Sequence, residues 1–163
     1  MTRKEYKLKF TPNEVFYVRK LLQEVKLKDV IAPKVIAINV DEPFSHVEEK
    51  MREFCIRHLP IVDKDNKLVG IITQRDLYRI QSPHKDEDGN WFYDKELLDT
   101  HILKYVMTPD PFTLSFDNHL SDALLHMVDR KYGCIPIVDE GKMLLGVITQ
   151  IDILNIAAQI LRE

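Results

Sequence analysis

Two apolar blocks decide the fold, Leu59–Asp63 (LPIVD) and Leu68–Asp76 (LVGIITQRD). Both return 76 residues later, as Ile135–Asp139 (IPIVD) and Leu144–Asp152 (LLGVITQID). Two apolar runs separated by polar turn residues predict a β-hairpin. Each second run ends in a threonine, a residue suited to cap a following helix. The sequence therefore predicts the same hairpin and helix twice.

The repeat extends beyond these blocks, because residues 30–77 align without a gap with residues 106–153. The identities far exceed the roughly 3 expected by chance. Short apolar runs at Val35–Val40 and Pro111–Phe116 predict an opening strand in each copy. Helix-start residues at 42–44 and 118–120 precede apolar residues at helical spacing. Each copy thus reads β-α-β-β-α, and the fold class is α+β.

Two segments lie outside the repeat. Thr11–Glu14 has the form of a capping box with proline at the first helical position. It predicts an amphipathic helix with its apolar residues on one side: Val15, Val18, Leu21, Leu22 and Val25. Ser82–Asn90 is polar and predicts a loop, and a helical stretch follows from Lys95 to about Tyr105. The expected organisation is an N-terminal helix (1–28), repeat 1 (29–81), a linker loop and helix (82–104) and repeat 2 (105–163).

Composition narrows the function. The 163 residues are 30% charged, with a formal net charge of -3 and no dense basic stretch, which argues against nucleic acid as the partner. No apolar run is long enough for a membrane span or a signal peptide. Two cysteines outside any CxxC pair fit a reducing cytoplasm. We therefore expect a cytoplasmic protein that binds neither nucleic acid nor a membrane.

Catalytic and metal motifs are missing from the sequence. We find no Ser-His-Asp or Cys-His arrangement, no HExxH and no P-loop lysine. His84, Asp86, Glu87 and Asp88 lack the spacing of an EF-hand and favour a solvated loop. We expect no enzymatic activity, no catalytic residue, no metal site and no required cofactor.

The repeated blocks, with Val106–Pro109 (VMTP) opening the second copy, resemble the CBS domain, named after cystathionine β-synthase. The resemblance implies two repeats packed with pseudo-twofold symmetry, a Bateman module, which often associates into homodimers. It also implies clefts for AMP, ADP, ATP or S-adenosylmethionine. Such pairs usually regulate an enzyme, channel or transporter, so a separate effector protein is a possible partner. The alternative is a ligand-free interaction or dimerisation module.

Residues at the helix starts suit an adenosine ligand. A carboxylate such as Asp76 or Asp152 can accept from both ribose hydroxyls, and a helix N-terminus offers N–H groups to phosphate. The family architecture implies clefts built crosswise. One cleft would combine Thr149, Asp152, Ile36, Ile56, Arg57 and His58. The other would combine Thr73, Arg75, Asp76, Thr108, Phe112, Tyr132, Gly133 and Cys134.

The two expected clefts differ in charge. Arg57 and His58 suggest that the Asp152 cleft binds a phosphorylated ligand more tightly. Simpler readings stay open: the aspartates could stabilise helix dipoles, the threonines could be caps alone, and Arg57 and His58 could form a solvated helix end.

Overall fold

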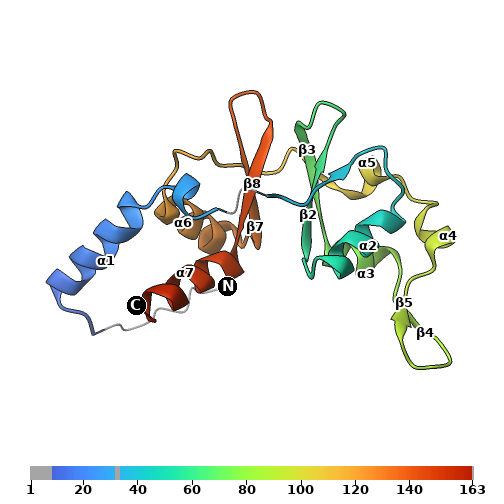
Figure 1. Ribbon diagram of the computed structural model, residues 1–163, viewed down its shortest axis with the longest axis horizontal. Helices are drawn as coiled ribbons and strands as arrows, with labels where there is room; N and C mark the ends of the chain where they lie inside the picture. Colours follow the sequence, from blue (N-terminus) through green and yellow to red (C-terminus); the bar gives the residue numbers. More distant parts are fainter. Residues whose placement is uncertain (1–8, 32–33, 163) are drawn as a thin grey trace.

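The computed structural model describes residues 9–31 and 34–162, and it contains the two copies in an α+β fold (Figure 1). Repeat 1 comprises β1 (Ile38–Asn39), α2 (Ser45–Glu53), β2 (His58–Val62), β3 (Leu68–Thr73) and α3 (Gln74–Ile80). Repeat 2 comprises β6 (Thr108–Pro109), α6 (Leu120–Arg130), β7 (Cys134–Val138), β8 (Leu144–Thr149) and α7 (Gln150–Ile160).

The hairpins of the two repeats have the same register. His58 pairs with Thr73 in one, and Cys134 pairs with Thr149 in the other. Both ladders shift at the same place, between the isoleucine and the valine of the apolar block. The 76-residue spacing therefore holds residue by residue in the β-ladders.

A pseudo-twofold axis passes between the hairpin tips. Lys67 forms an antiparallel bridge with Met143, the equivalent residue of the other repeat. The Leu68 N–H donates to Lys142 O at 2.9 Å, and the equivalent Leu144 N–H donates to Asn66 O at 3.2 Å. Equivalent residues also form the apolar cluster between the repeats: Val62, Leu68, Val138 and Leu144. This reciprocity shows the expected pseudo-twofold packing.

Each core is completed by a segment that lies before the other repeat in the chain. Leu103, in α5 (Leu103–Val106), is buried in the core of repeat 1. Leu27, its equivalent in the 3-10 helix Leu27–Asp29, is buried in the core of repeat 2. Strand β6 likewise joins the repeat 1 sheet, in the order β1-β2-β3-β6. The repeats thus share their opening segments crosswise.

Helix α1 (Pro12–Glu24) begins with the expected capping box, in which the Thr11 N–H donates to Glu14 at 2.8 Å. Its packing differs from the expectation, because no residue of α1 is buried. Only Leu22, with Val25 just beyond the helix, packs on the repeat 2 core. The remaining residues of the expected apolar side are exposed: Val15, Val18 and Leu21.

Three local expectations are wrong in extent. The strand expected at Val35–Val40 comprises only β1, and the one expected at Pro111–Phe116 is reduced to a single bridge between Leu114 and Ile137. The loop at 82–90 belongs to a hairpin of β4 (His84–Lys85) and β5 (Trp91–Phe92), stabilised by Lys85 Nζ 4.9 Å above the Trp91 ring. The helix expected over 95–105 is broken into α4 (Lys95–Leu98) and α5. Within the described ranges, none of the helices combines the length and apolar character needed to cross a bilayer.

Candidate functional site

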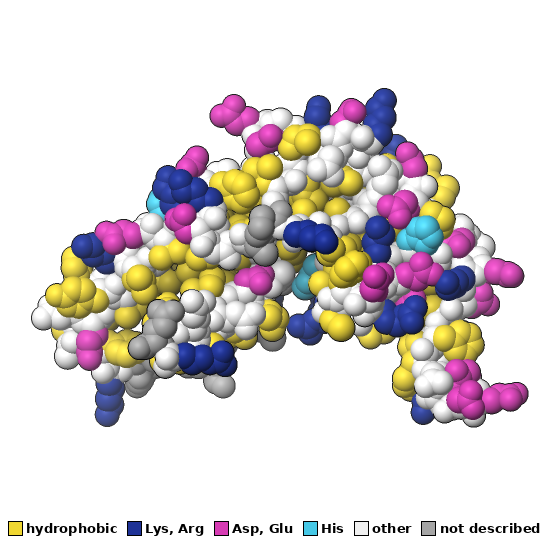
Figure 2. Space-filling model, viewed as in Figure 1, with side chains coloured by type: hydrophobic (Ala, Val, Ile, Leu, Met, Phe, Trp, Pro, Cys, Tyr) yellow, Lys and Arg dark blue, Asp and Glu magenta, His cyan; other side chains and the backbone are white. Residues whose placement is uncertain are grey.

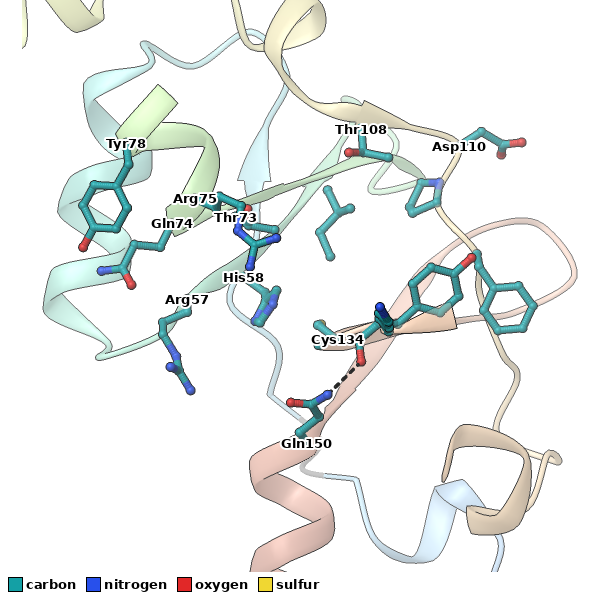
Figure 3. A pocket seen from close by; sticks show the side chains of 16 residues that line it. Arg57, His58, Thr73, Gln74, Arg75, Tyr78, Thr108, Asp110, Cys134 and Gln150 are labelled. Carbon is teal, nitrogen blue, oxygen red and sulfur yellow. Dashed lines mark hydrogen bonds between the residues drawn. The ribbon is translucent and has the colours of Figure 1, made fainter. Parts of the chain in front are cut away.

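A pocket of about 850 Å³ opens between the repeats, beside the starts of β2 and β7 (Figure 3). Repeat 1 contributes Arg57, His58, Ile71, Thr73, Gln74, Arg75 and Tyr78 to its lining. Repeat 2 contributes Thr108, Asp110, Pro111, Phe112, Lys131, Tyr132, Gly133, Cys134 and Gln150. Its volume lies within the usual range for small-molecule sites.

Arg57 and His58 line this pocket together with Thr73 and Arg75, not in a separate cleft as we expected. The hairpin register is the reason. His58 pairs with Thr73 across the ladder, and the Gln74 N–H donates to Arg57 O at 3.0 Å. The start of β2 and the start of α3 are therefore neighbours, and their side chains share one wall.

His58 lies half-buried against the backbone of repeat 2. A Cβ added at Gly133 would come within 2.7 Å of His58 Nε2, so a glycine there gives the imidazole its space. Burial lowers the pKa of His58 below its ordinary value, and the charge of Arg57 lowers it further, while Asp76 opposes the shift. At neutral pH this imidazole is uncharged and can donate or accept a hydrogen bond.

The pocket wall is positive. Arg57, Arg75 and Lys131 line it, whereas its one carboxylate, Asp110, accepts from Lys142 Nζ at 2.8 Å. That contact holds the pKa of Asp110 below its usual value. Within residues 9–31 and 34–162, neither Arg57 nor Arg75 forms an ion pair with an acidic residue. The arrangement favours an anionic ligand.

An aromatic surface also lines this pocket. The rings of Phe112 and Tyr132 stack with centroids 5.6 Å apart and an interplanar angle of 18°. Phe112 also contacts the His126 ring, with centroids 4.3 Å apart. Gln150 Nε2 donates to Tyr132 O at 3.3 Å, drawn as a dashed line in Figure 3. The surface can stack against a flat base.

Asp76 and Asp152 cap their own helices and do not line the pocket. Asp76 Oδ2 accepts from the N–H and the hydroxyl of Thr73 at 2.9 and 2.7 Å. Asp152 Oδ2 accepts in the same way from Thr149 at 2.7 and 2.6 Å. Asp76 Oδ1 also accepts from Arg79 at 3.4 Å, whereas Asp152 Oδ1 has no hydrogen-bond partner among the described residues.

The remaining expected site residues lie apart from this pocket. Ile36 and Ile56 pack on the repeat 1 core, and Thr149 starts α7. Sequence reasoning missed Gln74, Gln150 and Tyr78 in the lining. The two glutamines could have been found from the hairpin register, since each follows the capping threonine.

Cys134 occupies the position equivalent to His58. It is buried, and burial raises the pKa of its thiol to about 12. The thiol is therefore protonated at neutral pH and acts as a small apolar wall of the pocket, because only the thiolate is a nucleophile.

Two βαββα repeats with a shared pocket between them define a tandem repeat module. The sequence profile of the CBS domain matches residues 27–82 and 103–159. The chain therefore belongs to the CBS domain family, as a tandem pair. It is 35% identical over 135 residues to inosine-5'-monophosphate dehydrogenase of Methanocaldococcus jannaschii, which covers 82% of the chain but 24% of that enzyme.

Solved CBS pairs share the fold. The AMP complex of CBSX2 from Arabidopsis thaliana is 23% identical, with a TM-score of 0.68, over 83% of this chain and 98% of that one. The CBS domain pair of protein MJ0100, solved with 5-methylthioadenosine and S-adenosyl-L-methionine, is 22% identical with a TM-score of 0.67. There the likeness covers 83% of this chain and 97% of the other.

Proposed function

We propose that this protein is a non-enzymatic regulatory module that binds an adenine nucleotide in the pocket between its repeats. The positive wall, with Arg57 and Arg75 unpaired by any described acidic residue, is the observation that supports it best. A neutral ligand would leave these guanidinium groups without a counter-charge, whereas a phosphate can accept hydrogen bonds from a guanidinium group.

The stacked Phe112 and Tyr132 rings offer the base a flat apolar partner. Figure 3 shows Arg75 and His58 directed into the pocket from repeat 1, with Cys134 and Gln150 opposite. In this arrangement the arginines bind the phosphate, and Thr73 and Thr108 are the hydroxyl groups available to the ribose.

The solved relatives support the adenosine class, since one holds AMP and another S-adenosyl-L-methionine. Charge favours the nucleotide for this chain. The sulfonium of S-adenosylmethionine is a cation and would face Arg57 and Arg75, while each phosphate adds negative charge. The other cleft expected from the sequence, beside Thr149, Asp152, Ile36 and Ile56, would have Ile151 where this pocket has Arg75, and Arg57 and His58 line this pocket. We therefore assign the tighter binding to this pocket, which reverses the expectation from the sequence.

The proposed output is a change in how the repeats pack, read within a cytoplasmic homodimer or by a separate effector protein. A ligand can shift such an equilibrium only through different affinities for the two states. Because repeat 1 and repeat 2 both line the pocket, a change in how they pack would alter the contacts of the ligand.

Isothermal titration calorimetry tests the proposal with AMP, ATP, adenosine and S-adenosylmethionine. AMP or ATP should bind at least tenfold more tightly than adenosine. Arg75→Ala should weaken AMP binding by roughly 10- to 100-fold, since a hydrogen bond to a charged group contributes ~1.5–3 kcal/mol. Arg52→Ala, an exposed arginine on α2 that pairs with Glu48, is the control. No binding of any of these compounds would favour the ligand-free interaction module.

A further inference from the structure

The hairpin of β4 and β5 projects from the repeat 1 end of the molecule (Figure 1), and we call residues 84–92 the arm. Every residue of the arm is exposed, and Trp91 and Phe92 are 66% and 44% exposed. In repeat 2 the last helix continues to Ile160, the position equivalent to His84, whereas α3 has already ended at Ile80. The arm therefore distinguishes one end of the pseudo-twofold module from the other.

The arm is held in shape by its own contacts. Lys85 Nζ lies 4.9 Å from the centroid of the Trp91 ring. At the turn, the carboxylate of Asp86 accepts from the Asn90 N–H at 2.8 Å and from Asn90 Nδ2 at 3.2 Å. A two-stranded hairpin alone is only marginally stable in water, and this one buries none of its side chains. Such a preorganised, uncovered element loses little conformational entropy when a partner binds it.

The charge of the arm indicates the chemistry of that partner. Its turn contains Asp86, Glu87 and Asp88, and its one lysine, Lys85, lies over the ring of Trp91. Glu87 and Asp88 form no ion pair with any residue that the structure describes. Figure 2 shows the acidic side chains at the tip of the arm and hydrophobic ones beside them.

Charge complementarity therefore favours a basic partner surface. Tryptophan is among the residues that contribute most to binding at protein interfaces, where it fills an apolar hollow. The acidic turn repels the phosphates of nucleic acids and of anionic lipids. A protein with basic residues around an apolar hollow is the partner that fits Trp91 and the carboxylates beside it.

Helix α3 connects the arm to the pocket. Gln74 and Arg75 at its start and Tyr78 in its second turn line the pocket. The chain passes from its C-cap, Gln81, into the arm within three residues. Tyr93, which follows β5, packs on the repeat 1 core, where burial raises its pKa to about 12 and the nearby Tyr78 adds to the shift. Both ends of the arm are thus anchored close to Tyr78.

Gln81 lies at the joint between α3 and the arm. Its side chain is 6% exposed, and neither Nε2 nor Oε1 has a hydrogen-bond partner among the described residues. A buried amide without partners destabilises the arrangement that contains it. A second arrangement that gives this amide a partner would recover that free energy, so the joint meets a condition for having two states.

We propose that the arm is the docking site of a separate effector protein, which presents a basic surface around an apolar hollow for Trp91, and that nucleotide binding moves the arm through α3 and Gln81. The docking surface does not depend on the proposed function. The movement rests on it, because it requires a nucleotide in the pocket.

Fluorescence of Trp91, the single tryptophan in the sequence, tests the docking surface on the full chain. The probe is a short lysine–leucine peptide, and a glutamate–leucine peptide of the same length is its charge control. The lysine peptide should move the emission of Trp91 to shorter wavelength, and the glutamate peptide should leave it unchanged.

Removing the charge of the turn should weaken this binding. Glu87→Gln with Asp88→Asn should raise the dissociation constant of the lysine peptide at least about tenfold. The matched control is Asp65→Asn with Glu140→Gln, which makes the same charge change in the turns of the two other hairpins and should alter the constant less than about threefold. Equal weakening by the two variants, or an unchanged emission with the lysine peptide, overturns the docking surface.

Sedimentation velocity without peptide tests a second copy of the chain as the occupant. Trp91→Ala should leave the sedimentation coefficient unchanged. A loss of dimer in this variant would make the arm a contact between copies and overturn the assignment to an effector protein.

AMP titration tests the movement. In the wild type the emission of Trp91 should change with the dissociation constant that calorimetry gives. Gln81→Leu removes the unpaired amide outside the pocket lining, so it should bind AMP with less than about half of that emission change. AMP binding without an emission change in the wild type, or with an equal change in Gln81→Leu, overturns the proposed movement. Absence of AMP binding overturns the proposed function, and the docking surface is then decided by the peptide titration.

Discussion

Repeat 1 and repeat 2 share one scaffold but differ at the residues that meet other molecules. The position of Arg57 is occupied by Gly133 in repeat 2, that of His58 by Cys134, and that of Arg75 by Ile151. Repeat 1 therefore supplies two arginines to the pocket, whereas repeat 2 supplies one lysine, Lys131, and one carboxylate, Asp110, whose charges cancel. A duplicated fold can divide its roles in this way because ladder and core residues tolerate few changes, whereas surface residues tolerate many.

The largest expected effect tests whether the cores of the two repeats contribute equally to the free energy of unfolding. Ile61 and Ile137 are equivalent, and both are fully buried. Ile61→Ala and Ile137→Ala should each lower the free energy of unfolding by ~2–5 kcal/mol, through lost burial and the cavity left behind. Urea unfolding of the two variants measures it. Losses that differ by more than about 2 kcal/mol would show that the repeats are not energetic equivalents.

The capping boxes of α3 and α7 allow a second comparison of the repeats, with a smaller expected effect on stability. Asp76→Ala and Asp152→Ala should each cost about 1 kcal/mol of stability, because each removes the acceptor for the threonine that starts its helix. Their effects on AMP should differ. Asp76 orders the helix start that holds Arg75, so calorimetry should show a larger loss of AMP affinity for Asp76→Ala than for Asp152→Ala. Equal losses would contradict the inequality of the two clefts.

The hairpins, the helices that follow them and the capping threonines were predictable from the sequence, because periodicity and turn residues specify local structure. We assigned Arg57 and His58 to the other cleft because that assignment followed a crosswise scheme and not the ladder, in which residue 58 faces residue 73. The crosswise packing of Leu27 and Leu103 could not be predicted, because the sequence does not show which of the two cores an apolar residue packs into.

The solvent exposure of apolar side chains could not be predicted from the sequence either. Val15, Val18 and Leu21 have the spacing of a buried helical side, yet the structure leaves them open. The hairpin β4–β5 was missed because its strands are two residues long and its turn, where Asp86 accepts from the Asn90 N–H at 2.8 Å, reads as an ordinary polar loop. Spacing predicts that a face is apolar but not what covers it.

The contact of His58 with Gly133 makes a third prediction. Gly133→Ala places a methyl group 2.7 Å from Nε2 and 3.0 Å from Cε1 of His58, so the imidazole must move. Because the ring is the end of a flexible side chain, we expect a cost of about 1 kcal/mol, the low end for overpacking. In NMR titration the pKa of His58 should rise toward its ordinary value. An unchanged pKa would show that the ring keeps its place.

The smallest expected effect is a pH dependence that only repeat 1 possesses, since repeat 2 has Cys134 at the equivalent position. Burial and Arg57 lower the pKa of His58 in the folded state, and Asp76 only partly offsets them. The unfolded chain therefore takes up a proton at His58 at a higher pH than the folded protein does. The contribution of His58 to the free energy of unfolding is complete above the unfolded pKa near 6.5, and it declines as the pH falls toward the folded value.

His58→Gln should remove that part of the acid destabilisation measured by thermal melting between pH 7.5 and 5.5, while the contributions of the other histidines remain. A bound phosphate would act in the opposite sense, since its negative charge favours the imidazolium. AMP binding near pH 6.5 should accordingly take up protons in the wild type and fewer in His58→Gln, as calorimetry in buffers of different ionisation enthalpy detects. Equal proton uptake by both proteins would place the phosphate away from His58. It would then also lie away from Arg57 and Arg75, the other residues in which repeat 1 differs from repeat 2.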